Sequence, residues 1–194
     1  MKLPEELQTY HDPLESLQKL ISRFDQRGVV IGGIAASVLG QARYTEDVDA
    51  MFLLSTQDIP QFLSEAEQEG IVPRIENAAD FAKKRRVLLL RHIITGTNID
   101  ISLGIMPFEQ EVVERSSIQE FESALRVRLP TPEDLIIMKA IASRPKDLED
   151  IRTLVVKYPN LDRRRIERWV KDFAELMETP ELWGQIEKIL KGQE

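Results

Sequence analysis

Residues 29–49 read VVIGGIAASVLGQARYTEDVD, and this stretch decides the fold class. Val29–Ile31 is a short, wholly apolar strand that runs directly into the Gly-Gly pair at 32–33. A helix of small and apolar residues follows over Ile34–Leu39, and a polar stretch then leads to a second strand over 47–54. A strand, a glycine turn and a helix that follow one another without a linker predict mixed α/β structure.

The turn and the second strand carry residues that are typical of a phosphate and metal site. Gly32 and Gly33 expose backbone N–H groups at a helix N-terminus, where a phosphate can approach closely, although plain turn chemistry also explains them. Asp47 and Asp49 are two residues apart in a strand, so both point to one face, about 6.6 Å apart along the backbone. Two carboxylates so placed repel each other unless a cation lies between them or water screens an exposed strand end.

A third acid, Asp100, lies in the strand expected over 98–103. Its neighbours Ile99 and Ile101 turn it to the opposite face, and a buried carboxylate without a partner is costly. Three carboxylates from two strands, beside a phosphate-ready turn, predict a site for a divalent metal and a nucleoside triphosphate. Oxygen ligands suit Mg²⁺, which takes a few carboxylates and substrate phosphates and keeps several waters.

The remaining pattern divides the chain into an α/β part over residues 1–115 and a mainly helical part over 116–194. In the first part we expect a helix over 12–26, a helix from Ser55 or Thr56 to Gly70, a strand over 71–75, a short helix or loop over 78–84, and a hairpin with arms 86–95 and 98–103. In the second part we expect a strand over 124–129 and helices over 132–143, 146–157, 161–177 and 181–191.

Composition excludes several classes of protein. The 194 residues are 42% hydrophobic and 30% charged, which is ordinary for a globular protein, and the absence of cysteine excludes thiol nucleophiles and cysteine metal sites. A net charge of −7 argues against a general nucleic-acid coat. The longest uncharged apolar run is far shorter than the roughly 20 residues of a membrane span, and no secretory signal is evident. We therefore expect a cytoplasmic protein with no membrane association.

The glycine turn, the Asp47-x-Asp49 pair and the distant Asp100 together resemble the polymerase-β-type nucleotidyltransferase superfamily. Within it the chain is most similar to the minimal bacterial and archaeal group that includes the AbiEii-like toxins. The likeness extends to Gly40, to the run from Arg43 through Thr45 to Asp49, and to residues 133–151, so it spans residues 29 to about 152.

This resemblance implies an α+β (α/β) fold: a mixed β-sheet flanked by helices, followed by a C-terminal helical domain. It implies transfer of a nucleoside monophosphate from an NTP, with release of pyrophosphate, by catalysis with two Mg²⁺ ions. By the same likeness the metal ligands and catalytic residues are Asp47, Asp49 and Asp100, and the nucleotide-binding residues are Gly32, Gly33, Ser37, Arg43, Thr45, Lys139 and Asp147. Glycine replaces the serine common at the second turn position, so Ser37 is expected to supply the hydroxyl.

Lys139 lies in a helix that is apolar on nearly every side, so its ammonium needs an anion or must reach solvent. The anion is either the triphosphate or a carboxylate of the next helix, Asp147 or Asp150. The resemblance favours the triphosphate.

Several questions of function stay open at this stage. The donor is ATP, CTP, GTP or UTP, and the acceptor is an RNA end such as that of tRNA, a small molecule or a protein hydroxyl. The AbiEii-like resemblance also allows a toxin with a cognate antitoxin partner. The alternatives are a catalytically silent nucleotide-binding or antitoxin-like module with the same fold, and a helical adaptor whose aspartates are coincidental.

Overall fold

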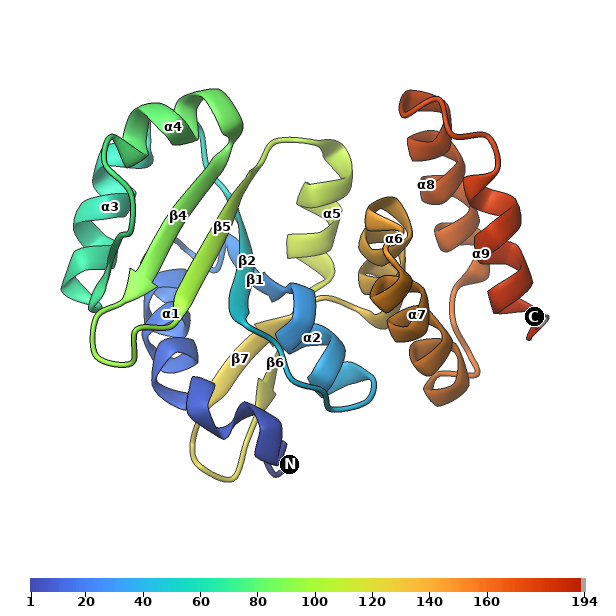
Figure 1. The fold of residues 1–194 in the computed structure, drawn as a ribbon, viewed down its shortest axis with the longest axis horizontal. Coiled ribbons are helices and arrows are strands. Elements are labelled where there is room, and N and C mark those ends of the chain that lie inside the picture. The colour runs from blue at the N-terminus through green and yellow to red at the C-terminus, as the bar shows by residue number, and fades with distance from the viewer. Residues whose placement is uncertain (193–194) are drawn as a thin grey trace. The chain divides into compact units, whose positions relative to one another are not determined.

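A five-stranded mixed sheet organises the N-terminal part of the chain in this computed structural model, which describes residues 1–192 (Figure 1). The strand order is β1-β2-β5-β4-β3. β2 and β5 are parallel, and the other neighbours are antiparallel. The strands are β1 (Gly28–Ile31), β2 (Asp47–Leu53), β3 (Ile71–Pro73), β4 (Val87–His92) and β5 (Asn98–Gly104).

Helices and a separate hairpin complete this part. The helices are a 3₁₀ turn η1 (Glu5–Tyr10), α1 (His11–Arg23), α2 (Gly32–Leu39), α3 (Ile59–Gln68), α4 (Ala78–Arg85) and α5 (Pro107–Arg115). The hairpin is β6 (Ser117–Glu120) with β7 (Arg126–Leu129). The mixed α/β architecture expected from the sequence is confirmed, and so is the antiparallel pairing of β4 with β5.

One face of the sheet is packed and the other carries the acidic residues. In β2 the even-numbered Val48, Ala50 and Phe52 are completely buried. The ring of Phe52 packs edge-on against those of Phe24, which follows α1, and Phe62 in α3, with centroids 6.3 and 4.9 Å apart. Aromatic burial of this kind anchors the helices on that face, so the odd-numbered acids of β2 project from the other face.

The C-terminal part consists of four helices: α6 (Pro132–Ala142), α7 (Pro145–Lys157), α8 (Arg163–Leu176) and α9 (Leu182–Leu190). The side chain of Thr131 accepts a hydrogen bond from the Asp134 N–H at 3.2 Å, and Pro132 occupies the first turn, so α6 begins as the sequence signal predicts. No helix within residues 1–192 has the length and apolarity needed to cross a bilayer.

The chain divides into two compact units, residues 1–38 with 42–130 (unit 1) and residues 39–41 with 131–194 (unit 2). The boundary expected from the sequence, at 115, differs from this one by the β6–β7 hairpin. That hairpin stays with unit 1 because β7 packs against β1 and α1. Its first strand, Ser117–Glu120, was not expected, since four largely polar residues give no clear period.

Candidate functional site

The glycine turn is shaped by close contact with Asp49. Gly32 has a φ of +64°, which favours glycine, and a Cβ built there would stand 2.7 Å from the Cβ and Cγ of Asp49. Any larger residue at position 32 would therefore displace this carboxylate. The absence of a side chain lets Asp49 lie directly against the N-terminal turn of α2.

Thr45 packs against the second glycine of the turn. A Cβ built at Gly33 would lie 2.8 Å from the Cβ of Thr45, so the threonine fills the space that a side chain at position 33 would need. The Thr45 hydroxyl donates to the Asp47 carbonyl at 3.3 Å, and the Tyr10 hydroxyl donates to the Thr45 carbonyl. The sequence thus places a hydroxyl beside the turn even though the turn itself lacks serine.

Ser37 has a different use from the one expected. Its side chain is buried, and its hydroxyl donates to the Arg43 carbonyl at 3.0 Å while accepting from the Arg43 N–H at 3.3 Å. A hydroxyl has one proton to donate, and here that proton is engaged within the chain. Ser37 and Arg43 thus hold the segment that leads from α2 to β2.

The register of β2 and β5 brings the three candidate carboxylates to one face. Asp49 pairs with Asp100, and Asp47 pairs with Asn98, in the parallel ladder. Paired residues on neighbouring strands point to the same face about 4.8 Å apart, and Asp47 and Asp49 share that face by their spacing. All three are partly exposed, whereas Val48 and Ile99 between them are completely buried. The predicted grouping on one face is therefore present in the fold.

Asp100 has a partner that sequence reasoning missed, namely Arg74. The Arg74 Nη2 atom lies 2.9 Å from the Asp100 Oδ1 atom, and the two side chains are 23% and 29% exposed. Arg74 follows β3, and its backbone N–H donates to the carbonyl of Leu89, which is the β4 residue paired with Asp100. The arginine therefore reaches across one strand. No local pattern could reveal a contact made across β4 by residues 26 positions apart.

The surroundings of Asp100 disfavour the ionised form of its carboxyl on balance. Burial raises the pKa of this carboxyl above its ordinary value, Arg74 offsets part of the rise, and the nearby charge of Asp47 adds to it. Asp47 therefore disfavours the charged form of Asp100, as a like charge on the same sheet face is expected to do.

The chemistry of this face fits a divalent cation, with one condition. Carboxylate oxygens are the ligands that Mg²⁺ prefers, and three of them project from adjacent strands. Within residues 1–192, however, no three acidic or histidine side chains are arranged closely enough to hold a metal ion. Asp100 instead lies on Arg74, so it would have to leave that arginine to complete a three-carboxylate site.

Lys139 and Asp147 lie in unit 2 and are paired with each other. The Lys139 Nζ atom is 3.0 Å from Asp147 Oδ1 and 2.8 Å from Asp150 Oδ2, and Lys139 is only 5% exposed. The ammonium therefore does not reach solvent, and its anions are the carboxylates that the sequence offered as one alternative. Burial alone would raise the pKa of Asp147, but hydrogen bonds from Arg144 and Lys139 outweigh it and hold that pKa below its usual range.

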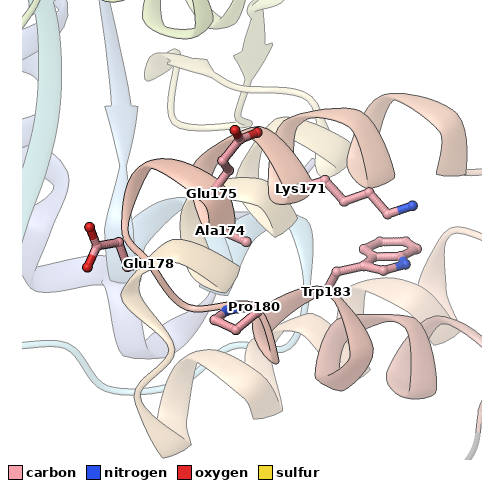
Figure 2. Close-up of a pocket in the computed structure, with 6 residues that line it drawn as sticks. All are labelled: Lys171, Ala174, Glu175, Glu178, Pro180 and Trp183. Carbon is pink, nitrogen blue, oxygen red and sulfur yellow. The ribbon is translucent and has the colours of Figure 1, made fainter.

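A separate groove lies between α8 and α9 of unit 2 (Figure 2). The Lys171 side chain extends over the indole of Trp183, with Nζ 5.5 Å from the ring centroid, and Pro180 and Ala174 add apolar surface. The residues that line it include none of the predicted site residues.

Comparisons with known proteins agree with this architecture. The structure is similar to that of an antigenic nucleotidyltransferase-like protein from Paracoccidioides brasiliensis, with a TM-score of 0.51 and 16% identity, covering 96% of this chain and 94% of that one. It is also similar to the antibiotic-resistance factor ANT(2'')-Ia, with a TM-score of 0.52 and 16% identity, covering 87% and 95%. At these identities the likeness shows the fold alone. No curated protein matches the chain.

A family model supplies the assignment. The model described as "Nucleotidyltransferase of unknown function (DUF6036)" matches residues 8–181, which include the glycine turn, all three carboxylates and most of unit 2. The match supports the nucleotidyltransferase resemblance of the sequence but not its AbiEii-like subgroup. The chain belongs to this nucleotidyltransferase family.

Proposed function

We propose that this protein transfers a nucleoside monophosphate from an NTP to a hydroxyl acceptor, with Mg²⁺ held by Asp47, Asp49 and Asp100. The observation that carries the proposal is the register of β2 and β5, in which Asp49 lies beside Asp100 with Asp47 on the same face. The glycine turn packs directly against Asp49, so a triphosphate on the turn would lie next to the carboxylates.

In this proposal the acceptor oxygen attacks the α-phosphorus, and the bond from that phosphorus to the bridging oxygen of the β-phosphate breaks. Pyrophosphate leaves, and Asp100 helps to take up the proton of the attacking hydroxyl. The divalent metals, when bound, neutralise the developing charge and orient the attacking and leaving oxygens. Asp47 and Asp49 would hold the metal cations in position. The N–H groups of the Gly32-Gly33 turn would donate to the phosphate oxygens.

Thr45 is the residue that we propose to supply the hydroxyl contact to phosphate. It lies against Gly33, where a serine side chain would otherwise stand. To reach a phosphate its hydroxyl would have to turn from the Asp47 carbonyl, to which it donates at 3.3 Å, whereas the Ser37 hydroxyl is buried and donates to the Arg43 carbonyl at 3.0 Å. Arg43, Lys139 and Asp147 stay nucleotide-binding candidates on the resemblance. Because Lys139 is ion-paired with Asp147 and Asp150, its contribution to the stability of the fold should be measured first.

The acceptor is best sought first among small molecules and short RNA ends. A net charge of −7 disfavours extended contact with a nucleic-acid backbone. We place the reaction in the cytoplasm, where NTP donors are available. A toxin role with a cognate antitoxin rests on the AbiEii-like resemblance, and its test is growth: expression of the wild type should arrest growth, whereas Asp49→Asn should not.

The decisive experiment supplies each α-labelled NTP with Mg²⁺ and one acceptor pool at a time: total RNA, aminoglycosides, or cell protein. We expect label on a single acceptor class with the wild type and with Asp80→Asn, an exposed acid of α4. Asp49→Asn should give none. Asp100→Asn should retain most NTP binding and lose turnover, since a ligand of the catalytic metal acts chiefly in the transition state.

One observation favours the alternative of a catalytically silent nucleotide-binding module. The Arg74 guanidinium is already paired with Asp100, which the proposed reaction needs as a metal ligand. This alternative predicts NTP binding by calorimetry with no labelled product from any acceptor pool. Failure to bind any NTP would instead indicate that the aspartates are coincidental.

A further inference from the structure

The ion pair between Arg74 and Asp100 is incompletely hydrogen-bonded. Arg74 Nη2 is within 2.9 Å of Asp100 Oδ1, yet that buried oxygen has no aligned hydrogen-bond donor among the described residues. The Arg74 Nη1 atom is also buried and has no hydrogen-bond partner within residues 1–192. A guanidinium binds a carboxylate most strongly through two parallel hydrogen bonds. This pair therefore attracts by charge through a single Arg74 nitrogen, and the Nη1 donor beside it is left without a hydrogen-bond partner among the described residues.

The pair lies where it would affect metal binding as well as stability. Asp100 lies in register with Asp49, and Asp47 lies two residues before Asp49 in β2, on the same face of the sheet. Without a cation three carboxylates on one sheet face would repel each other, so the guanidinium offsets part of that repulsion. A divalent metal that used Asp100 as a ligand would have to take the place of Arg74 at the same oxygen.

We propose that Arg74 is a positioning residue that holds Asp100 while the site lacks metal and gives it up when a divalent cation binds with nucleotide. The inference rests on the proposed function, because it assumes that Asp100 becomes a metal ligand. It follows that the metal competes with the guanidinium, so metal affinity in the absence of nucleotide is lower than three carboxylates alone would give.

The test measures Mn²⁺ affinity by electron paramagnetic resonance, and melting temperature without metal, for the wild type, Arg74→Gln and Arg74→Lys. Arg85→Gln is the matched control, because it removes the same charge from an exposed arginine at the end of α4. Without nucleotide, Arg74→Gln should bind Mn²⁺ about tenfold or more tightly than the wild type, since an arginine beside an aspartate changes its proton affinity by one to three powers of ten. Its melting temperature without metal should fall. Arg74→Lys should remain close to the wild type, and Arg85→Gln should match it in both measurements.

A merely structural Arg74 would lower the melting temperature without tightening Mn²⁺ binding, and that result would overturn the inference. The double variant Arg74→Gln with Asp100→Asn should lose the gain in affinity, and an undiminished gain would equally count against it.

If Arg74→Gln does not fold, the wild type provides the measurement. Mg²⁺ with a non-hydrolysable NTP should move the Arg74 side-chain Nε–H signal in an NMR spectrum, where the signal is assigned by its absence in Arg74→Lys. An unmoved signal would overturn the inference. If the wild type binds no Mn²⁺ even with the NTP analogue, both the inference and the proposed function fail. If it binds Mn²⁺ with the analogue but Arg74→Gln binds no more tightly, only the inference fails.

Discussion

The two units of the chain differ in how their clustered charged side chains are buried and paired. On the sheet face of unit 1, Asp47, Asp49 and Asp100 lie together and are partly exposed, and Arg74 pairs with one of them. In unit 2, several charged side chains of α6, α7 and α8 are buried, and each of them has an opposite charge close by. This contrast separates a partly exposed acidic face, for which we propose a metal, from a buried network of paired charges.

The unit 2 network ties three helices together. Lys139 of α6 is paired with Asp147 and Asp150 of α7, and Arg144 adds a second cation at 2.5 Å from Asp147. A second pair joins Asp134 of α6 to Arg165 of α8, with Nη2 and Oδ1 2.7 Å apart. Apart from the exposed Arg144, these charges are buried and would be costly if unpaired, so removal of one buried member leaves another without its partner.

The largest effect expected from the contrast is on activity, in unit 1. Asp49→Asn should lower transfer about a thousandfold or more, because several kcal/mol of charge stabilisation in the transition state disappear with the metal ligand. Its melting temperature without metal should hold or rise slightly, since the change removes one negative charge from an acidic face. Calorimetric melts with and without Mg²⁺ and NTP check this, with Asp80→Asn as the control. A large loss of stability without metal would show that Asp49 is structural, like the acids of unit 2.

The sequence predicted the strand face on which each acid of unit 1 lies, because that face is set by local periodicity. The spacing of Asp47 and Asp49, and the isoleucines around Asp100, fix one face for each strand, and the parallel register of β2 and β5 then unites them. Arg74 was missed because its contact depends on the strand order, in which β4 separates it from Asp100. The role of Ser37 was also unpredictable, since its partner Arg43 is set by a loop.

The next largest effect is on stability, in unit 2. Lys139→Met should lower the free energy of unfolding by roughly 3–5 kcal/mol, because two buried carboxylates lose their shared cation. Lys191→Met, which removes a half-exposed lysine from a surface pair with Glu187, should change it by less than about 1 kcal/mol. Urea unfolding of both variants checks the difference. A small loss for Lys139→Met together with weaker NTP binding would assign the ammonium to the triphosphate instead.

Substitution of two helical glycines, one in each unit, should have a smaller effect on stability. A Cβ at Gly33 meets Thr45 at 2.8 Å, whereas a Cβ at Gly184 in α9 meets nothing within 4 Å. Gly184→Ala should stabilise by about 0.5–1 kcal/mol through helix propensity, and Gly33→Ala should destabilise by about 1–3 kcal/mol through overpacking. Adding Thr45→Ala to Gly33→Ala should restore stability, which urea unfolding of the double variant measures. Equal gains at both glycines would mean that the turn is not closely packed.

The smallest effect is the acid dependence of the unit 2 network. The pKa of Asp147 is lower in the folded chain than its ordinary value, because hydrogen bonds from Arg144 and Lys139 outweigh the effect of burial. A folded state with the lower pKa binds fewer protons than the unfolded chain, so this group contributes stability that is fully present above its unfolded pKa of about 4. That contribution is lost as the pH falls through the folded pKa. Asp147→Asn should therefore be clearly less stable than the wild type at pH 7, and the gap should narrow below about pH 4.

Denaturant unfolding of the wild type and Asp147→Asn at a series of pH values measures this gap directly. Glu149→Gln is the matched control, because Glu149 lies on the same helix, is 72% exposed, and pairs only with Arg152 among the ion pairs found in residues 1–192. Its difference from the wild type should stay within about 1 kcal/mol at every pH, as for other surface pairs. A gap for Asp147→Asn that is constant with pH would mean that the variant acts through packing rather than through the charge of the carboxylate. The same constancy would remove the charge-based ground for contrasting the buried network of unit 2 with the partly exposed acids of unit 1.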